Sequence, residues 1–331
     1  MKEFQNIFHG KKVLITGGLG FIGSSLAHRL VEMGAHIVLV DSLIPEYGGN
    51  LFNIEDIKDK VMINIADVRD EYSMKYLVKG KEYLFNLAGQ TSHVDSMNDP
   101  YTDLEINCRS QLSILEACRK NNPEIKIVFA STRQIYGRPT YLPVDEKHPL
   151  SPVDVNGINK IAGEFYHILY NNIYGIRACA LRLTNTYGPK MRVKDARQTF
   201  LGIWIKRLLE GAPIDVFGDG EQLRDFNYVD DVVDALIITA TMDEANGQVF
   251  NLGSDEKISL KKLAELMVSL NKSGNYRIIP FPPERKAIDI GDYYSNWKLI
   301  HDKLGWIPRI SLEDGLKNTI EFYRNHLEKY L

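Results

Sequence analysis

The sequence predicts an α/β fold, a doubly wound parallel sheet with a smaller, interleaved C-terminal α/β domain. In the first half of the chain, short β-branched runs alternate with stretches that place apolar residues three and four apart. The first run leads into the glycine-rich turn TGGLGFIG, and the second run ends in an aspartate. This alternation is typical of parallel βαβ units, in which helices cover both faces of a buried sheet.

The predicted strands of the first half are, in order, KVLIT, HIVLV, KVMIN, EYLFNLA, KIVFAS and RACALRL. Between them, SSLAHRLVEMG and DLEINCRSQLSILEACRKN have the apolar spacing of amphipathic helices. After Leu183 the strands shorten and Gly/Pro turns become frequent. We therefore expect a sheet domain over residues 1–185 and a substrate domain over 186–331. The two should be interleaved, because VFNLG at 249–253 has the composition of one more short buried strand.

The bulk composition limits the kinds of partner. The chain has 331 residues, 44% of them hydrophobic, which suffices for a large core. Its 40 basic and 43 acidic residues give no charge pattern suited to nucleic acid or an anionic membrane. No uncharged apolar run approaches the roughly 18 residues that would span a bilayer, and MKEFQNIFHGKK lacks the apolar core of a signal peptide. Cys108, Cys118 and Cys179 fit no disulfide or zinc pattern, so we expect a cytoplasmic protein without a metal.

The glycine-rich turn predicts a dinucleotide site. Gly17, Gly20 and Gly23 have the spacing GxxGxxG before a helix, where small residues bring the backbone and a helix N-terminus close to a pyrophosphate. Asp41 ends the second strand about 20 residues later, where a carboxylate binds ribose hydroxyls and favours NAD over NADP. Asp67 follows the third strand and either binds the adenine amino group or caps the next helix. Adjoining residues complete the predicted Rossmann-type cofactor site: Phe21, Ile22, Val68 and Leu87.

Together with FNLAGQTSHVD, STRQIYG, RLTNTYGP and QLRDFNYVDD, these motifs resemble those of extended short-chain dehydrogenase/reductases, more narrowly the NAD-dependent nucleotide-sugar epimerases and dehydratases. The resemblance implies that Thr132 and Lys160 lie beside the nicotinamide, with Lys160 bound to its ribose. It also implies a catalytic tyrosine at residue 156, where this chain has Asn156. An amide cannot act as a base, so the family's usual proton route is missing.

Two residues are candidates to replace the tyrosine. Asp154 precedes the helix that carries Lys160 and could serve as the base, or it could simply cap that helix. His93 lies in a loop that lines the sugar pocket in the family, and imidazole exchanges protons near neutral pH. Its alternative is a hydrogen-bonded structural histidine.

The substrate side also departs from part of the family. Arg133 and Gln134 stand where sugar dehydratases have an Asp-Glu pair, and neither exchanges protons at neutral pH, which weakens a dehydratase function. Arg133 could bind a sugar carboxylate or form a structural ion pair. The resemblance implies that Asn185 binds the nucleotide diphosphate or the sugar, that Arg224 binds the diphosphate or the ribose, and that Arg285 is a second phosphate-binding arginine. Residues 190–211 have the spacing of one amphipathic helix beside that pocket.

We therefore expect an NAD-dependent nucleotide-sugar epimerase, with a UDP-sugar as substrate. Within the same class, a dehydratase, a dehydrogenase and a decarboxylase remain open. From another class, a catalytically silent regulatory protein that binds NAD and a nucleotide sugar remains open because of Asn156. The resemblance also implies a homodimer held by a four-helix bundle to which residues 103–121 contribute.

Overall fold

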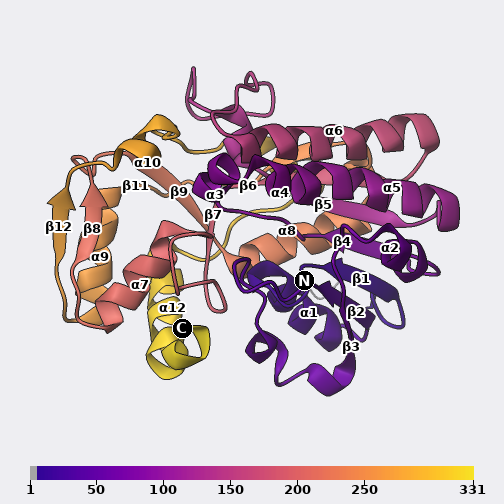
Figure 1. Cartoon of the computed structure of the whole chain (residues 1–331), viewed down its shortest axis with the longest axis horizontal. Coiled ribbons are helices and arrows are strands. Elements are labelled where there is room, and N and C mark those ends of the chain that lie inside the picture. Colours follow the sequence, from indigo (N-terminus) through magenta and orange to yellow (C-terminus); the bar gives the residue numbers. More distant parts are fainter. Residues whose placement is uncertain (1–5) are drawn as a thin grey trace.

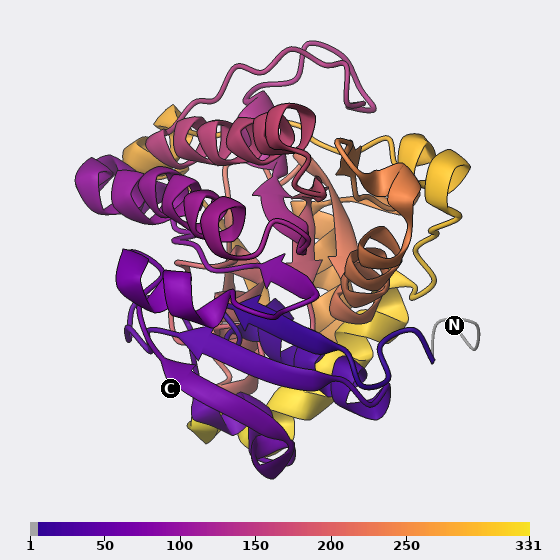
Figure 2. The ribbon, with the colours of Figure 1, turned by 90° about the vertical axis from the view of Figure 1, so that its right-hand side faces the viewer.

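A seven-stranded parallel sheet lies at the centre of the molecule (Figures 1 and 2). The computed structural model describes residues 6–331. The strand order is β3-β2-β1-β4-β5-β6-β10, and each neighbouring pair is parallel. The strands are β1 (Lys12–Thr16), β2 (His36–Asp41), β3 (Val61–Ile65), β4 (Tyr83–Asn86), β5 (Lys126–Thr132), β6 (Ala178–Leu183) and β10 (Val249–Asn251). The predicted doubly wound fold is confirmed, and its strand order reverses between β1 and β4, where such sheets bind ligands.

Helices cover both faces of the sheet because successive residues of a strand point to opposite sides. Val13 and Ile15 belong to a core shared with α1 and α8, whereas Leu14 belongs to a second core shared with α2, α5 and α6. These helices are α1 (Phe21–Glu32), α2 (Glu71–Leu77), α5 (Ser110–Asn121), α6 (Val155–Tyr174) and α8 (Val229–Thr241). Figure 1 shows α5 and α6 side by side on one face.

The helix expected over 103–121 is interrupted. It consists of α4 (Pro100–Leu104), a π-helical turn (Glu105–Arg109) and α5. The Ile106 carbonyl accepts from Ser110 Oγ at 2.6 Å and from Gln111 Nε2 at 3.1 Å. Side chains that bond a helix carbonyl in this way compete with the regular backbone pattern, which accounts for the wider turn.

The second half builds two small sheets beside the large one, in the order β11-β9-β7 and β12-β8. Their strands are β7 (Asn185–Tyr187), β8 (Ile214–Phe217), β9 (Leu223–Tyr228), β11 (Lys257–Ser259) and β12 (Tyr276–Ile279). The accompanying helices are α7 (Phe200–Leu209), α9 (Leu260–Asn271), α10 (Pro283–Ala287), α11 (Lys298–Leu304) and α12 (Leu312–His326). The same half also supplies α8 and β10 to the large sheet, so the chain leaves that sheet after β6 and returns to it.

The prediction of a single helix over residues 190–211 is wrong for the first half of that range. Helix α7 begins at Phe200, after Thr199, whose hydroxyl accepts from the Leu201 amide at 3.3 Å. The preceding residues are irregular because side chains bind backbone amides there: Gln198 Oε1 accepts from the Arg192 amide at 2.8 Å. This irregular segment lines the cavity described below.

Within residues 6–331, no helix combines the length and the apolar character needed to cross a membrane. The N-terminal segment is predicted to be no signal peptide. Its residues 1–5 lie outside the described residues. The three cysteines are free thiols.

Candidate active site

Two adjoining cavities lie at the C-terminal edge of the large sheet. The larger has a volume of about 600 Å³ and is lined by both halves of the chain, and the smaller, of about 130 Å³, lies over the glycine-rich turn. Several residues line both cavities, among them Phe21, Leu87, Gly89 and Ala130. The two therefore form one continuous cleft at the position where doubly wound sheets bind ligands.

The glycine-rich turn fits a pyrophosphate. Gly17 has φ +67°, and a Cβ at Gly23 would lie 2.2 Å from the Gly17 carbonyl oxygen, so α1 can pack on this turn only with glycine there. At the start of α1, Gly20 provides no side-chain cap, which leaves the first helical N–H groups available. A helix end of this kind binds anions through its N–H groups and its dipole.

Asp41 is held at the end of β2 by backbone amides. Its Oδ2 accepts from the Leu19 amide at 3.1 Å, and its Oδ1 accepts from the Leu43 amide at 3.0 Å. Burial raises the pKa of Asp41, although these amides oppose the shift. The structure brings the predicted cofactor residues, except Lys160, to the wall of the smaller cavity: Gly17, Gly20, Phe21, Ile22, Gly23, Asp41, Asp67, Val68 and Leu87.

Asp67 does not cap the helix that follows it. The N-cap of α2 is Asp70, whose Oδ1 accepts from the Tyr72 amide at 3.0 Å, so the capping alternative for Asp67 is wrong. Asp67 instead forms an ion pair with Arg69, with Nη2 and Oδ2 2.6 Å apart. Burial would raise the pKa of Asp67, but the Arg69 guanidinium outweighs burial and lowers it.

Thr132 and Lys160 line the larger cavity near its junction with the smaller one. Thr132 ends β5, and its Oγ1 accepts from the Gln134 amide at 3.2 Å. Lys160, on α6, is buried, and its Nζ donates to the Ala130 carbonyl at 3.2 Å and lies 5.0 Å from the Phe129 ring centroid. Burial lowers the pKa of Lys160 to about 8. Its ammonium thus has N–H donors left for a ligand.

Asn156 is part of a buried polar cluster, the Asp103 cluster, which comprises Asp103, Asn107, Asn156 and Asn159. Asn156 Nδ2 donates to Asp103 Oδ2 at 3.1 Å and to the Gln90 carbonyl at 2.8 Å. Asn107 and Asn159 also donate to Asp103, at 3.0 and 2.8 Å. The amide at the tyrosine position therefore stabilises a buried carboxylate and supplies no titratable group. Sequence reasoning missed Asp103, although its spacing of four from Asn107 could have indicated a pair on one helix face.

Asp154 and His93 form a pair at the entrance to α6. Asp154 is buried and caps α6, because its Oδ1 accepts from the Gly157 amide at 2.7 Å. Its Oδ2 accepts from Gln134 Nε2 at 2.8 Å and lies 3.0 Å from His93 Nδ1. Among the described residues His93 Nδ1 has no hydrogen-bond partner, so its approach to Asp154 is an ion pair when the imidazole is protonated. Burial would raise the pKa of Asp154, but His93 and the two hydrogen bonds outweigh burial and lower it.

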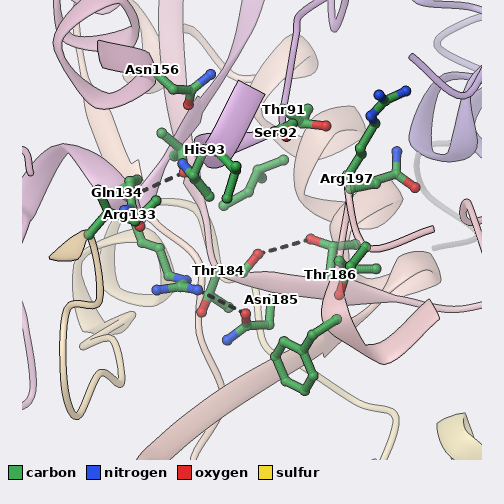
Figure 3. Close-up of a pocket in the computed structure, with 18 of the residues that line it drawn as sticks. Thr91, Ser92, His93, Arg133, Gln134, Asn156, Thr184, Asn185, Thr186 and Arg197 are labelled. Atoms are coloured by element: carbon green, nitrogen blue, oxygen red, sulfur yellow. Dashed lines mark hydrogen bonds between the residues drawn. The ribbon is translucent and has the colours of Figure 1, made fainter. Parts of the chain in front are cut away.

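The capping interpretation of Asp154 is thus confirmed, and both of its oxygens are occupied. His93 is partly exposed and lines the larger cavity, as Figure 3 shows. Of the two candidate bases, only His93 reaches the cavity surface. Asp154 can influence a ligand in the cavity through its contact with His93.

Four polar residues predicted for the substrate also line the larger cavity: Arg133, Asn185, Arg224 and Arg285. Arg133 Nη2 donates to Asn185 Oδ1 at 2.9 Å (Figure 3). Arg224 donates to the Leu223 carbonyl at 2.9 Å and lies 3.4 Å from Asp289 Oδ1. The Arg285 guanidinium lies 5.8 Å from the Phe217 ring centroid. No ion pair within 4.0 Å joins Arg133 to a carboxylate of residues 6–331, although Asp225, Asp289 and Asp154 act on its charge from farther away.

The model of the NAD dependent epimerase/dehydratase family matches residues 13–253, which is more than half of the chain. The chain belongs to this family. It is 32% identical over 319 residues to the UDP-glucose 4-epimerase of Mycolicibacterium smegmatis, covering 95% of this chain and 99% of the relative. It is also 32% identical to the UDP-N-acetyl-α-D-glucosaminuronate decarboxylase of Bacillus cytotoxicus, covering 95% and 98%.

Among solved structures, the UDP-glucose 4-epimerase of Thermotoga maritima with UDP-glucose superposes with a TM-score of 0.86 at 31% identity, covering 96% of this chain and 99% of that one. The resemblance to nucleotide-sugar epimerases and dehydratases is thus confirmed. This family member is an enzyme whose cofactor is NAD, and the glycine-rich turn and Asp41 suit that dinucleotide.

Proposed function

We propose that this enzyme is a nucleotide-sugar epimerase that oxidises one sugar carbon transiently and acts on a UDP-sugar. The observation that carries the proposal is the continuous cleft, whose smaller cavity is lined by the glycine-rich turn and whose larger cavity is lined by Thr132, Lys160, Arg224 and Arg285. Both curated relatives described above act on UDP-sugars by name, which supports the choice of nucleotide.

NAD supplies a hydride acceptor that can return the hydride to either face of the oxidised carbon. In the proposal, Lys160 binds the nicotinamide ribose and Thr132 donates to the reacting sugar oxygen. His93 takes the hydroxyl proton as the carbon loses its hydride, and gives the proton back when the hydride returns. Asp154 Oδ2, 3.0 Å from His93 Nδ1, places a carboxylate beside the imidazole that takes up the proton.

Proton chemistry argues for epimerisation over elimination. Sugar dehydratases of the family use an acid and base pair at the positions of Arg133 and Gln134. Here the Gln134 amide donates to Asp154, and Arg133 donates to Asn185. Neither residue can remove or deliver the proton that loss of water requires.

The deciding experiment mixes the purified protein and NAD with a panel of UDP-, GDP-, CDP- and dTDP-sugars. We expect a UDP-sugar to give its epimer, identified by chromatography, with at most a transient absorbance of reduced nicotinamide. A lasting absorbance would indicate a dehydrogenase, and loss of carbon dioxide or water would indicate the other two alternatives. Measurable binding with neither absorbance change nor product would contradict the epimerase and favour the catalytically silent protein.

The proposal includes a cytoplasmic homodimer. The free thiols suit a reducing compartment. For the dimer, support comes from exposed apolar side chains along one face of α6, namely Ile158, Phe165, Leu169 and Ile173. Together with Tyr101 and Leu104 of α4, which are also exposed, we call these residues the α4/α6 apolar face.

A further inference from the structure

Arg133 forms no close ion pair within residues 6–331, although the charges of Asp225, Asp289 and Asp154 act on it from farther away. One of its five N–H donors is given to Asn185, and Nη1 is enclosed without an acceptor. The guanidinium carbon lies 5.1 Å from the Tyr293 ring centroid, which shields this side from water. Burial lowers the pKa of Arg133, and the neighbouring Tyr293 and the carboxylates named above offset only part of that shift.

The carboxylates that line the same cavity are already paired with arginines. Asp95 pairs with Arg197 at 3.0 Å, Asp195 with Arg192 at 2.6 Å, Asp215 with Arg277 at 2.5 Å and Asp289 with Arg224 at 3.4 Å. The described wall of the cavity therefore offers Arg133 no unpaired carboxylate with which to form an ion pair. Arg133 also repels Arg224: burial first, and then Arg133, lower the pKa of Arg224 to about 10. A ligand anion beside Arg133 would offset both the burial of its charge and its repulsion of Arg224.

The proposed substrate brings two kinds of group to this wall. Its diphosphate is assigned to Arg224 and Arg285, which line the larger cavity but not the smaller one over the glycine-rich turn. Arg133 differs from both, because it directly follows Thr132, the residue assigned to the reacting sugar oxygen. A guanidinium there is positioned for the sugar ring and its substituents rather than for the nucleotide.

We infer that Arg133 binds a carboxylate carried by the sugar, so that the enzyme's substrate is an acidic nucleotide sugar. This inference rests on the proposed nucleotide-sugar function and narrows its substrate class. A guanidinium fork matches a carboxylate with two parallel hydrogen bonds, which a neutral hydroxymethyl group cannot form.

The test is equilibrium binding by titration calorimetry on the NAD-loaded protein, with UDP, UDP-glucose and UDP-glucuronic acid. The two sugars differ only in the group on the terminal carbon. We expect a preference of about tenfold or more for the acid, in line with a charge-assisted hydrogen-bond pair. A second pair, UDP-N-acetylglucosamine and UDP-N-acetylmuramic acid, places the carboxylate on a side group of the ring. A preference in either pair supports the inference and locates the carboxylate, whereas no preference in both pairs overturns it.

Arg133→Gln should abolish the preference and leave the affinity for UDP within about twofold, because a lost contact affects only the ligand group that makes it. Arg285→Gln is the matched control, which should weaken all the ligands alike. If Arg133→Gln weakens UDP as much as it weakens the acid, Arg133 binds the diphosphate and the inference is wrong.

A second variant keeps the inference testable if Arg133→Gln fails to fold. Asn185→Asp leaves Arg133 in place but sets a carboxylate where the amide oxygen now lies, 2.9 Å from Nη2. It should reduce the preference for the acid as well, and an unchanged preference would count against the inference. Since only binding is measured, a protein that binds but never transfers hydride would fail the proposed function and still pass this test.

Discussion

Asn156 shows how one residue can change the chemistry of a site without disturbing its frame. The phenol that the family uses is replaced by an amide that donates to Asp103 and to the Gln90 carbonyl. Lys160, one helical turn later, keeps its place beside Ala130. The helix that carries Lys160 is therefore in place, and in the proposed reaction the proton moves through a side chain other than residue 156.

We predict that His93→Gln lowers kcat by about 10²- to 10⁴-fold, the usual contribution of a general base. Cofactor binding, followed by nicotinamide fluorescence, should be unchanged. Asp154→Asn should give a smaller loss, because asparagine caps α6 as well as aspartate but leaves His93 without a charged partner. Unchanged turnover in a stable His93→Gln protein would remove His93 from the mechanism.

His167 makes stability depend on pH. It is buried on α6, donates from Nδ1 to the Gly163 carbonyl at 2.7 Å and stacks on Phe129 at 4.3 Å. Burial lowers the pKa of His167 to about 4. Between this value and the unfolded value of about 6.5, the unfolded chain holds a proton that the native protein does not, so stability falls as pH falls through this window.

The expected loss from this one group approaches 3 kcal/mol, as an order of magnitude, between about pH 6.5 and pH 4. Urea denaturation at several pH values should show a smaller loss of unfolding free energy on acidification for His167→Gln than for the wild type. His36→Gln, at an exposed position of β2, is the matched control substitution. Parallel pH profiles for His167→Gln and the wild type would show that His167 is not the cause.

At this scale the sequence predicted the residues whose roles depend on local backbone geometry. Gly17, Gly20 and Gly23 were identifiable because a strand, a tight turn and a helix follow one another directly. The Asp103 cluster as a whole was not identifiable, because spacing relates only Asp103 to Asn107, whereas Asn156 and Asn159 reach Asp103 from α6. Its burial depends on packing between elements distant in the sequence. The contact between His93 and Asp154 was missed for the same reason, although both residues were named.

Helix α6 is joined to the sheet by a buried ion pair. Glu164 on α6 and Arg182 on β6 are both buried, with Nη2 and Oε1 2.6 Å apart and a second contact from Nε to Oε2 at 3.1 Å. Ser131 Oγ on β5 donates to the same carboxylate at 2.7 Å. The pair therefore connects the helix that carries Lys160 to two strands that end at the cleft.

We predict that Glu164→Ala lowers the free energy of unfolding by about 3–5 kcal/mol, because it leaves the buried Arg182 guanidinium without its partner. Replacing both residues, as Glu164→Leu with Arg182→Met, should recover most of the loss, since no uncompensated charge remains. Guanidinium denaturation of the wild type, Glu164→Leu, Arg182→Met and the double variant would measure this coupling. A loss in the double variant equal to the sum of the single losses would contradict it.

Among elements, the strands were the most predictable, because buried parallel strands are short apolar runs with few alternatives. The six strands predicted for the first half correspond to β1 to β6, and VFNLG corresponds to β10. The π-helical turn at Glu105–Arg109 and the irregular residues 190–199 were not predictable from apolar spacing. In both, side-chain bonds to the backbone override a spacing that suits a regular helix.

For the whole molecule, we predict a homodimer through the α4/α6 apolar face. Phe165 and Ile173 are exposed over 55% and 65% of their surface, and a soluble monomer seldom leaves such a stripe uncovered. Phe165→Glu with Leu169→Glu should give a monomer, measured by size exclusion with light scattering. Ile278→Glu, at an exposed apolar position of β12, is the control and should remain dimeric. A wild type that is monomeric at all concentrations would contradict the prediction.

The return of the chain to the large sheet through β10 has a consequence for synthesis on the ribosome. Strands β1 to β6 are complete by residue 183, but among residues 6–331 the outer edge of β6 pairs only with Val249–Asn251. Until those residues emerge, a nascent chain presents an open, apolar strand edge, the kind of edge that pairs with other chains. The amino-terminal half therefore cannot finish folding while it is being made, and this interval is when a chaperone would protect it most.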